Sequence, residues 1–243
     1  MTDTLRLKDV RFSYDGVHQM RFDVSIASGE FVAILGASGS GKSTLLSLLA
    51  GFEEAQSGTI ILAGQDVTQA PPAKRPISMV FQDNNLFAHL SVADNVGLGL
   101  APNLKLNDAM RAKRNDALAR TGLADLADRK PDQLSGGQRQ RVALARALVR
   151  NRRVLLLDEA FASLGPGLRA DMLNLVKALH REAGLVTLMV THAPEDAALV
   201  ADRVLFVDQG AIIWDAPAAS AFDRHDLPPQ VQHYLETSGD NSA

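Results

Sequence analysis

The chain has 243 residues, of which 46% are hydrophobic, so it can bury the core of one or two domains. Its formal net charge of −3 gives no overall attraction to nucleic acid or to an anionic membrane surface. Without cysteine the chain forms neither a disulfide nor a thiolate metal site, and no apolar stretch approaches the about 20 residues of a membrane-spanning helix.

The first part of the chain is predicted to be β-structure. Residues Leu5–Ile26 alternate apolar and polar side chains around the turn residues Asp15 and Gly16, which predicts an antiparallel β region. The following run, Phe31–Leu35, is apolar throughout, as is typical of a strand buried on both faces.

A glycine-rich loop follows that strand directly. Four residues separate Gly36 from Gly41, which is followed by Lys42, Ser43 and the predicted helix Leu45–Ala50. Glycines let backbone N–H groups turn inward around an anion where a Cβ would clash, and the helix N-terminus adds roughly half a positive charge. A plain glycine turn is the alternative, but lysine and serine in register favour phosphate binding, with the serine hydroxyl placed to hold Mg²⁺.

Two short strands and a helical region come next. Thr59–Leu62 and Ser78–Phe81 are strand candidates on either side of a proline-marked loop. From Ser91 to Arg150 the β-branched runs thin out, and Ala, Leu, Asp, Lys and Arg dominate with helical spacing. This pattern predicts a helical subdomain inserted into an α/β core.

Residues Leu134–Gln138 (LSGGQ), here called the signature segment, precede a predicted helix. Ser135 followed three residues later by Gln138 fits a capping box, which is a purely structural role. The glycines Gly136 and Gly137 also expose backbone N–H groups to a possible second phosphate site. The residues alone leave both interpretations open.

An apolar run that ends in two acids follows. Val154–Leu157 leads into Asp158 and Glu159, which places carboxylates at the carboxyl edge of a parallel sheet, where ligands of such sheets bind. There Asp158 would help to hold Mg²⁺, and Glu159 would orient and deprotonate a water that attacks a γ-phosphate. The alternative is a polar helix start after a core strand.

The remaining elements complete an α/β pattern. An amphipathic helix is predicted over about Leu168–Leu179, and a buried strand over Leu185–Val190. Buried strands that alternate with helices imply a mostly parallel sheet. We expect no regular structure over Ser238–Ala243.

In this order the glycine loop, the signature segment and the acidic pair resemble the nucleotide-binding subunit of ABC transporters, from about Leu5 to Asp215. The resemblance implies an α/β fold with a P-loop NTPase (RecA-like) core, a mostly parallel sheet, an antiparallel β subdomain and an inserted helical subdomain. It implies one ABC ATPase domain over residues 1–243, with the core at about 1–87 and 151–215, the helical subdomain at about 88–150 and a short tail at 216–243.

The resemblance also assigns roles to three further residues. Tyr14 matches the aromatic that stacks on adenine, although a strand-surface aromatic is the alternative. Gln82 matches the glutamine that senses Mg²⁺ and the attacking water, and His192 matches the histidine that contacts the γ-phosphate.

The implied site thus has catalytic, metal and nucleotide groups. The catalytic residues are Lys42, Gln82, Glu159 and His192, and the Mg²⁺ ligands are Ser43, Gln82 and Asp158. The residues expected to bind ATP are Tyr14, Gly36, Ala37, Ser38, Gly39, Ser40, Gly41, Lys42, Ser43, Thr44, Ser135, Gly136, Gly137 and Gln138.

One chain carries one copy of each motif. In the family, the signature segment of one subunit completes the phosphate site of its partner, so the resemblance implies a homodimer with two ATP molecules at its interface. Two positions depart from the family pattern: Ala160 replaces the usual proline, and Gly165 replaces an aspartate that helps to tie the two sites together.

The segments Met79–Leu90, Asn95–Leu100 and Leu104–Asn107 resemble the ATPase subunit of bacterial thiamine importers. This implies uptake of thiamine or its phosphates through an integral-membrane permease, with a periplasmic solute-binding protein and no nucleic acid partner. The chain would then lie peripherally at the cytoplasmic face of the bacterial inner membrane. The alternatives are an importer ATPase for another small solute and a soluble ABC ATPase that works outside transport.

Overall fold

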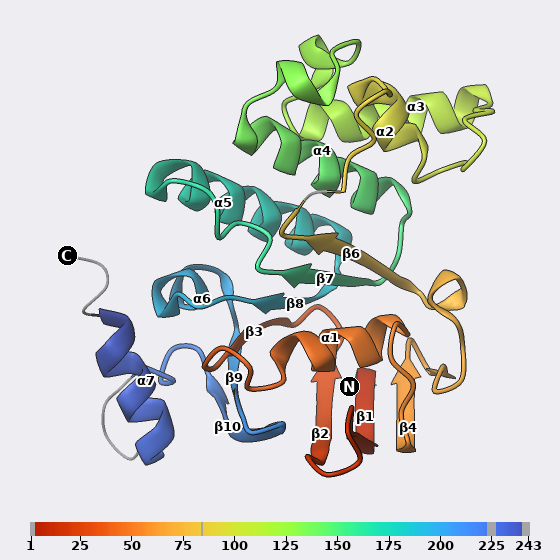
Figure 1. The fold of residues 1–243 in the computed structure, drawn as a ribbon. Coiled ribbons are helices and arrows are strands. Elements are labelled where there is room, and N and C mark those ends of the chain that lie inside the picture. Colours follow the sequence, from red (N-terminus) through yellow and green to blue (C-terminus); the bar gives the residue numbers. More distant parts are fainter. Residues whose placement is uncertain (1–2, 84, 223–226, 240–243) are drawn as a thin grey trace.

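The computed structural model describes residues 3–83, 85–222 and 227–239 (Figure 1). Its strands are β1 (Asp3–Phe12), β2 (Met20–Ala27), β3 (Phe31–Leu35), β4 (Ser57–Leu62), β5 (Gln65–Asp66), β6 (Ile77–Phe81), β7 (Val154–Asp158), β8 (Val186–Val190), β9 (Arg203–Asp208) and β10 (Ala211–Pro217). Its helices are α1 (Lys42–Ala50), α2 (Val92–Gly97), α3 (Asp108–Arg120), α4 (Gly136–Val149), α5 (Pro166–Ala183), α6 (Pro194–Val200) and α7 (Pro229–Gly239).

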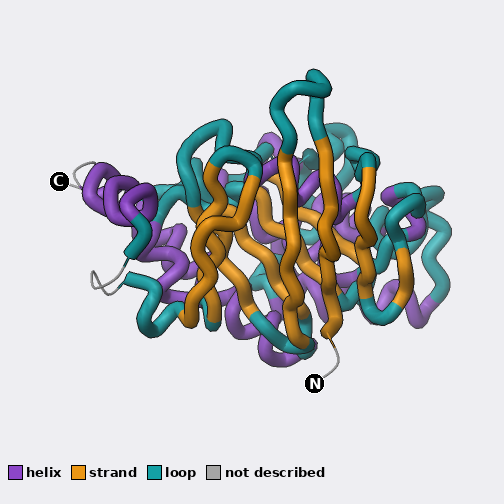
Figure 2. The backbone as a smooth tube through the Cα atoms, turned by 90° about the horizontal axis from the view of Figure 1, so that it is seen from below, coloured by secondary structure: helices purple, strands orange, loops and turns teal. Residues whose placement is uncertain are grey.

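The described strands form one sheet in the order β5-β4-β1-β2-β10-β9-β3-β8-β7-β6. Strand β3 pairs in parallel with β8 and β9, and β7 pairs in parallel with β6 and β8. Strand β1 instead pairs antiparallel with β2 and β4, and Figure 2 shows the strands side by side. The predicted α/β class, with a parallel core and an antiparallel β region, is confirmed.

The predicted buried strands lie close to the observed ones. Strand β3 has the predicted bounds, and β6, β7 and β8 each differ from prediction by one residue at one end. The sequence analysis did not predict β9 and β10, an antiparallel pair that turns at Gln209 and Gly210. Most of β10 is half-buried, so its sequence lacks the clear apolar alternation that would have marked a strand.

Helices cover both faces of the parallel strands, with α1 and α5 on opposite sides (Figure 1). Alternate residues of β7 face these two layers: Leu156 packs in one cluster with Leu45 of α1, whereas Leu155 and Leu157 pack in another with Met172 of α5. Because both faces are buried, these strands are apolar throughout rather than alternating.

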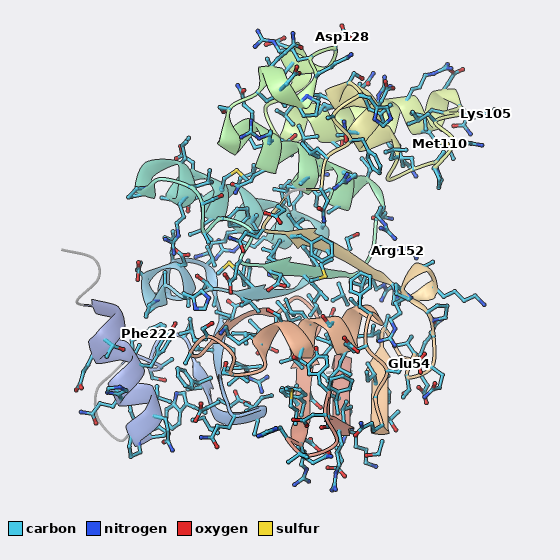
Figure 3. All side chains as sticks on the ribbon, viewed as in Figure 1. Glu54, Lys105, Met110, Asp128, Arg152 and Phe222 are labelled. Carbon is cyan, nitrogen blue, oxygen red and sulfur yellow. The ribbon has the colours of Figure 1, made fainter. Side chains whose placement is uncertain are left out.

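Helices α2, α3 and α4 gather beyond β6 at one end of the molecule (Figure 1). Their facing side chains form an apolar cluster that includes Val96, Leu118 and Val142. Figure 3 shows Lys105 and Asp128 on this end, away from the sheet. The boundaries drawn for this helical subdomain stay a prediction.

The C-terminal segment is more ordered than its sequence predicts. The expectation of no regular structure is wrong for Ser238 and Gly239, which end helix α7, and residues 240–243 lie outside the described residues. Helix α7 docks because Val231 is buried in a cluster with Phe206 of β9, a contact that local composition does not reveal. In the described part of the chain, none of the helices has the length and hydrophobicity to cross a bilayer.

A buried arginine caps the C-terminal end of α1. Arg75 is 2% exposed, and its Nη1 donates to the carbonyl oxygens of Leu48 at 2.5 Å and Leu49 at 2.9 Å. Burial lowers the pKa of this guanidinium. It satisfies carbonyls that the helix end leaves unpaired and opposes the negative end of the helix dipole. A Cβ added at Gly51 would lie 2.5 Å from Arg75 Nε, so this corner requires glycine.

Replacing Arg75 should therefore destabilise the protein. The change Arg75→Met leaves buried carbonyl oxygens without a donor, which should lower the free energy of unfolding by about 3 kcal/mol. Urea unfolding followed by the fluorescence of Trp214 measures the change. The matched control is Lys74→Met at the exposed neighbouring position, which should stay within about 0.5 kcal/mol of wild type. Equal stability of the two variants would contradict the capping role.

Candidate active site

The glycine loop between β3 and α1 has the backbone that its sequence predicts. Gly36 has φ of 145°, and a Cβ there would lie 2.1 Å from the carbonyl oxygen of Val207. Gly41 is the N-cap of α1 with φ of 107°, and it accepts from the backbone N–H of Leu45 at 2.9 Å. Because a glycine N-cap has no side chain to occupy the first N–H groups of the helix, those donors can serve an anion.

Lys42 spans the loop. Its Nζ donates to the carbonyl oxygens of Gly36 at 2.8 Å and Ala37 at 2.7 Å, and the residue is only 4% exposed. Burial lowers the pKa of the Lys42 ammonium, and the carboxylates of Glu159 and Asp158 oppose this shift. A positive charge desolvated in this way interacts strongly with a phosphate, because little water screens it.

Two oxygen-bearing side chains meet beside the loop. Ser43 Oγ lies 3.4 Å from Asp158 Oδ1, and both residues line a cavity of about 260 Å³ with Gln82 and Glu159. Burial raises the pKa of Asp158, and the neighbouring Glu159 carboxylate raises it further. Hydroxyl, amide and carboxylate oxygens are ligands that suit Mg²⁺, which keeps few protein ligands when it also binds phosphate.

Glu159 and His192 are in direct contact. The imidazole Nε2 of His192 lies 2.6 Å from Glu159 Oε1. The pairing of β7 with β8 places Asp158 opposite Val190, so the residues that follow the two strands emerge side by side. Glu159 has a left-handed backbone with φ of 48°, a conformation that non-glycine residues adopt at an energetic cost and often at functional sites.

Buried charge anchors the loop that carries His192. Asp196 Oδ2 accepts from Arg169 Nε at 2.8 Å and from Thr191 Oγ1 at 3.0 Å. The same hydroxyl of Thr191 accepts from the backbone N–H of Ala193 at 3.1 Å. These contacts hold the residues on both sides of His192 and link them to the start of α5.

Tyr14 lies at the rim of the loop. Its ring packs edge-on against Phe12 with centroids 4.6 Å apart, its hydroxyl lies 3.5 Å from Thr44 Oγ1, and it is 63% exposed. Tyr14 and Met20 line a cleft of about 380 Å³ together with residues of the glycine loop, Glu159 and His192. An exposed aromatic at this rim offers a stacking surface for a planar base.

The signature segment lines a different cavity. Gln138 N donates to Ser135 Oγ at 3.3 Å and Ser135 N donates to Gln138 Oε1 at 2.9 Å, so the predicted capping box is present. Ser135, Gly137 and Gln138 line a cavity of about 310 Å³ with Leu168 and others. Among the described residues of one chain, the structure does not bring the signature segment into the glycine-loop cavities.

The sequence profile of the ABC transporter family matches residues 19–162. The chain belongs to this family. It is an ABC-type ATPase and binds nucleotide. It is 58% identical over 231 residues to the thiamine import ATP-binding protein ThiQ of Brucella suis, covering 95% of each chain. It is 55% identical over 211 residues to ThiQ of Salmonella paratyphi A, covering 86% of this chain and 89% of that one.

Solved ABC proteins have the same fold as this ATPase. One is cbiO1 from Clostridium perfringens, part of the ABC transporter complex cbiONQ, with a TM-score of 0.85 and 30% identity over 97% of this chain and 100% of that chain. Another is an ATP-binding cassette of an ABC transporter in its ADP conformation, with a TM-score of 0.87 and 26% identity over 97% and 99% of the two chains.

The predicted site residues of this ABC ATPase lie in two places, at the glycine loop and at the signature-segment cavity described above. Those that line the cavities at the glycine loop are Tyr14, Ala37, Ser38, Gly39, Gly41, Lys42, Ser43, Thr44, Gln82, Asp158, Glu159 and His192. Gly36 and Ser40 are buried beneath the loop, and in the described part of the chain Ser40 Oγ has no hydrogen-bond partner. The roles assigned to all these residues stay predictions.

The two departures from the family pattern are Ala160, which follows Glu159, and Gly165, which precedes α5. Ala160 is 2% exposed and packs in the core beneath Glu159. Gly165 is the N-cap of α5 with φ of −64°, and among the described residues other than its two chain neighbours, none has an atom within 4 Å of the position that a Cβ would take. The backbone thus accepts an aspartate at 165 without strain, so the family residue is absent for no steric reason.

The sequence analysis missed two residues around the site. Met20 lines the cleft because the β1–β2 register sets it opposite Phe12, which the alternation of the hairpin could have indicated. Tyr234 lines the cavity beside His192, and no local pattern connects two residues so far apart in sequence.

Replacing the proposed catalytic base tests the site directly. Glu159→Gln keeps the size of the side chain but removes its basicity, so hydrolysis should slow by roughly 10²–10⁴-fold while nucleotide binding persists. Phosphate release and equilibrium nucleotide binding measure the two effects. Glu54→Gln, at an exposed position beyond the C-terminal end of α1 (Figure 3), is the matched control. A normal rate for Glu159→Gln would remove Glu159 as the base.

Proposed function

We propose that this chain is the ATP-hydrolysing subunit of an ABC importer for thiamine or its phosphates. The support is the likeness to relatives named for thiamine import, which extends over nearly the whole chain. In such a system the solute contacts the membrane permease and its binding protein, so the solute assignment rests on this likeness rather than on the ATPase site.

The geometry supports separate roles for the residues that would contact the phosphates, the adenine and Mg²⁺. Lys42 and the glycine loop bind the outer phosphates, and Tyr14 offers its ring to the adenine. Ser43, Gln82 and Asp158 would hold Mg²⁺, which neutralises phosphate charge when bound. In the described residues no group of three or more His, Cys, Asp or Glu could hold a metal ion, so nucleotide oxygens would complete the ion's coordination.

Glu159 and His192 then act on the attacking water. Glu159 accepts a proton from the attacking water, and the water oxygen bonds to the γ-phosphorus as the bond from that phosphorus to the leaving ADP breaks. The contact with His192 Nε2 fixes the direction of the Glu159 carboxylate. His192 lines the same cleft as Lys42, so its imidazole would lie near the terminal phosphate of a bound nucleotide. The two residues therefore work as a pair.

A second copy of the chain would complete each site. The signature segment lies at the start of α4 in its own cavity and presents Ser135 and the backbone of Gly136 on an exposed surface. In a two-fold dimer it would face the partner's glycine loop, so that the γ-phosphate has ligands on both sides. Hydrolysis removes that shared anion and lets the dimer open.

The surface after Gln82 is suited to docking a permease. Phe87 is 49% exposed, and the buried amide of Asn95 bonds to its backbone N–H at 2.9 Å and to its carbonyl at 3.1 Å. This clamp holds an apolar ring toward solvent at the junction between the core (about 1–87 and 151–215) and the helical subdomain (about 88–150). Docking there would place the chain at the cytoplasmic face of the bacterial inner membrane, beside a permease served by a periplasmic solute-binding protein.

Uptake measurements test the solute. In bacterial cells that lack this chain but retain the permease and binding protein of the proposed transporter, wild type should restore uptake of labelled thiamine. The Glu159→Gln form should not, because the dimer cannot reset without hydrolysis. An unrelated labelled vitamin is the control. Intact ATPase activity without restored thiamine uptake would overturn the solute assignment and leave the enzyme assignment standing.

Mixing two inactive variants tests the shared site. Lys42→Ala removes the positive charge that would bind the phosphates, and Ser135→Arg blocks the signature segment. Each variant homodimer should therefore lose activity. A mixed dimer carries both lesions in one site and leaves the other intact. An equal mixture should thus recover about a quarter of wild-type hydrolysis if the sites act independently. Full activity of Ser135→Arg alone as a monomer would contradict the shared site.

A further inference from the structure

Helix α7 reaches the loop that carries His192. The hydroxyl of Tyr234 on α7 donates to the main-chain carbonyl oxygen of His192 at 2.9 Å. The Tyr234 ring is seated edge-on against Phe206 of β9, with ring centroids 5.1 Å apart. The hydroxyl thus contacts the backbone of the very residue whose imidazole touches Glu159.

The other anchors of this loop hold the neighbours of His192. Asp196 accepts from the Thr191 hydroxyl, and that hydroxyl accepts from the Ala193 N–H. The His192 side chain itself is 44% exposed, so packing alone does not fix it. Tyr234 therefore holds the carbonyl group of His192, which lies between the buried residues Thr191 and Ala193.

The helix that carries Tyr234 is firmly seated. Val231 is 3% exposed and packs in one cluster with Ala33 and Leu35 of β3, the strand that leads into the glycine loop. Tyr234 also lines a cavity of about 410 Å³ with Ser38 of that loop and with Glu159. One helix outside the recognised motifs is thus fixed to the strand of the glycine loop and to the histidine loop together.

We propose that Tyr234 is a positioning residue for ATP hydrolysis. Its hydroxyl fixes the backbone at His192, His192 fixes the carboxylate of Glu159, and α7 thereby sets the orientation of the base. Orientation of a base affects the chemical step rather than nucleotide binding, because the nucleotide is held by the glycine loop. The proposal concerns hydrolysis and holds whichever solute the transporter carries.

Tyr234→Phe tests this by removing one oxygen and keeping the ring on Phe206. In the full chain, the kcat for ATP should fall about three- to tenfold, the size expected for one hydrogen bond, while KM and the stoichiometry of nucleotide binding stay unchanged. Unchanged stoichiometry excludes a loss of folded protein. Trp214, the sole tryptophan, packs on the same cluster as α7, so unchanged Trp214 emission shows that the helix remains docked.

The matched control is Thr237→Ala. Thr237 Oγ1 donates to the carbonyl oxygens of His233 and Tyr234 within α7, so this change removes a hydroxyl from the same helix without touching the histidine loop. Its kcat should equal that of wild type. The proposal is overturned if Tyr234→Phe has unchanged or raised kcat, or if both variants lose activity equally. It is also overturned if the loss comes with altered Trp214 emission, because undocking of α7 would then be the cause.

Discussion

The parallel pairing of β3, β8 and β7 is the constraint on which the active site depends. Ile34 of β3 lies opposite Val190 of β8, and Val190 lies opposite Asp158 of β7. Because the carboxyl ends of these strands coincide, the glycine loop, the histidine loop and the acidic pair emerge at one edge of the sheet. Three segments far apart in sequence thereby supply an ammonium group, a carboxylate and an imidazole within one cleft.

This edge combines groups that are unfavourable on their own. Glu159 has positive φ, and burial disfavours the charged forms of Lys42 and Asp158. The layers on both sides hold these groups in place, since α1 and α5 bury alternate residues of the same strands. The guanidinium of Arg75 holds the C-terminal end of α1 and so fixes the helix whose first residue is Lys42.

The signature segment and the glycine loop lie apart within one chain, and this separation is expected to couple nucleotide binding to the closing of a dimer. In the proposed dimer, a site that is incomplete in one chain would bind nucleotide best when two copies meet, so the γ-phosphate would favour the closed pair over the open one. Helix α5 lies between the two places, because Leu168 lines the signature cavity and Arg169 binds Asp196 beside the histidine loop. Adjacent residues in one turn of α5 thus contact both places.

The sequence alone determined which segments carry the proposed site residues and most of the core strands. The glycine loop, the acidic pair and the apolar strands are local patterns whose spacing or periodicity has a direct physical cause, so β3 and β7 could be placed almost to the residue. Tertiary structure alone decided the rest. The half-buried strand β10, the docked helix α7 and the contact of Tyr234 with His192 depend on packing between distant segments, and no local periodicity records which surface a segment will cover.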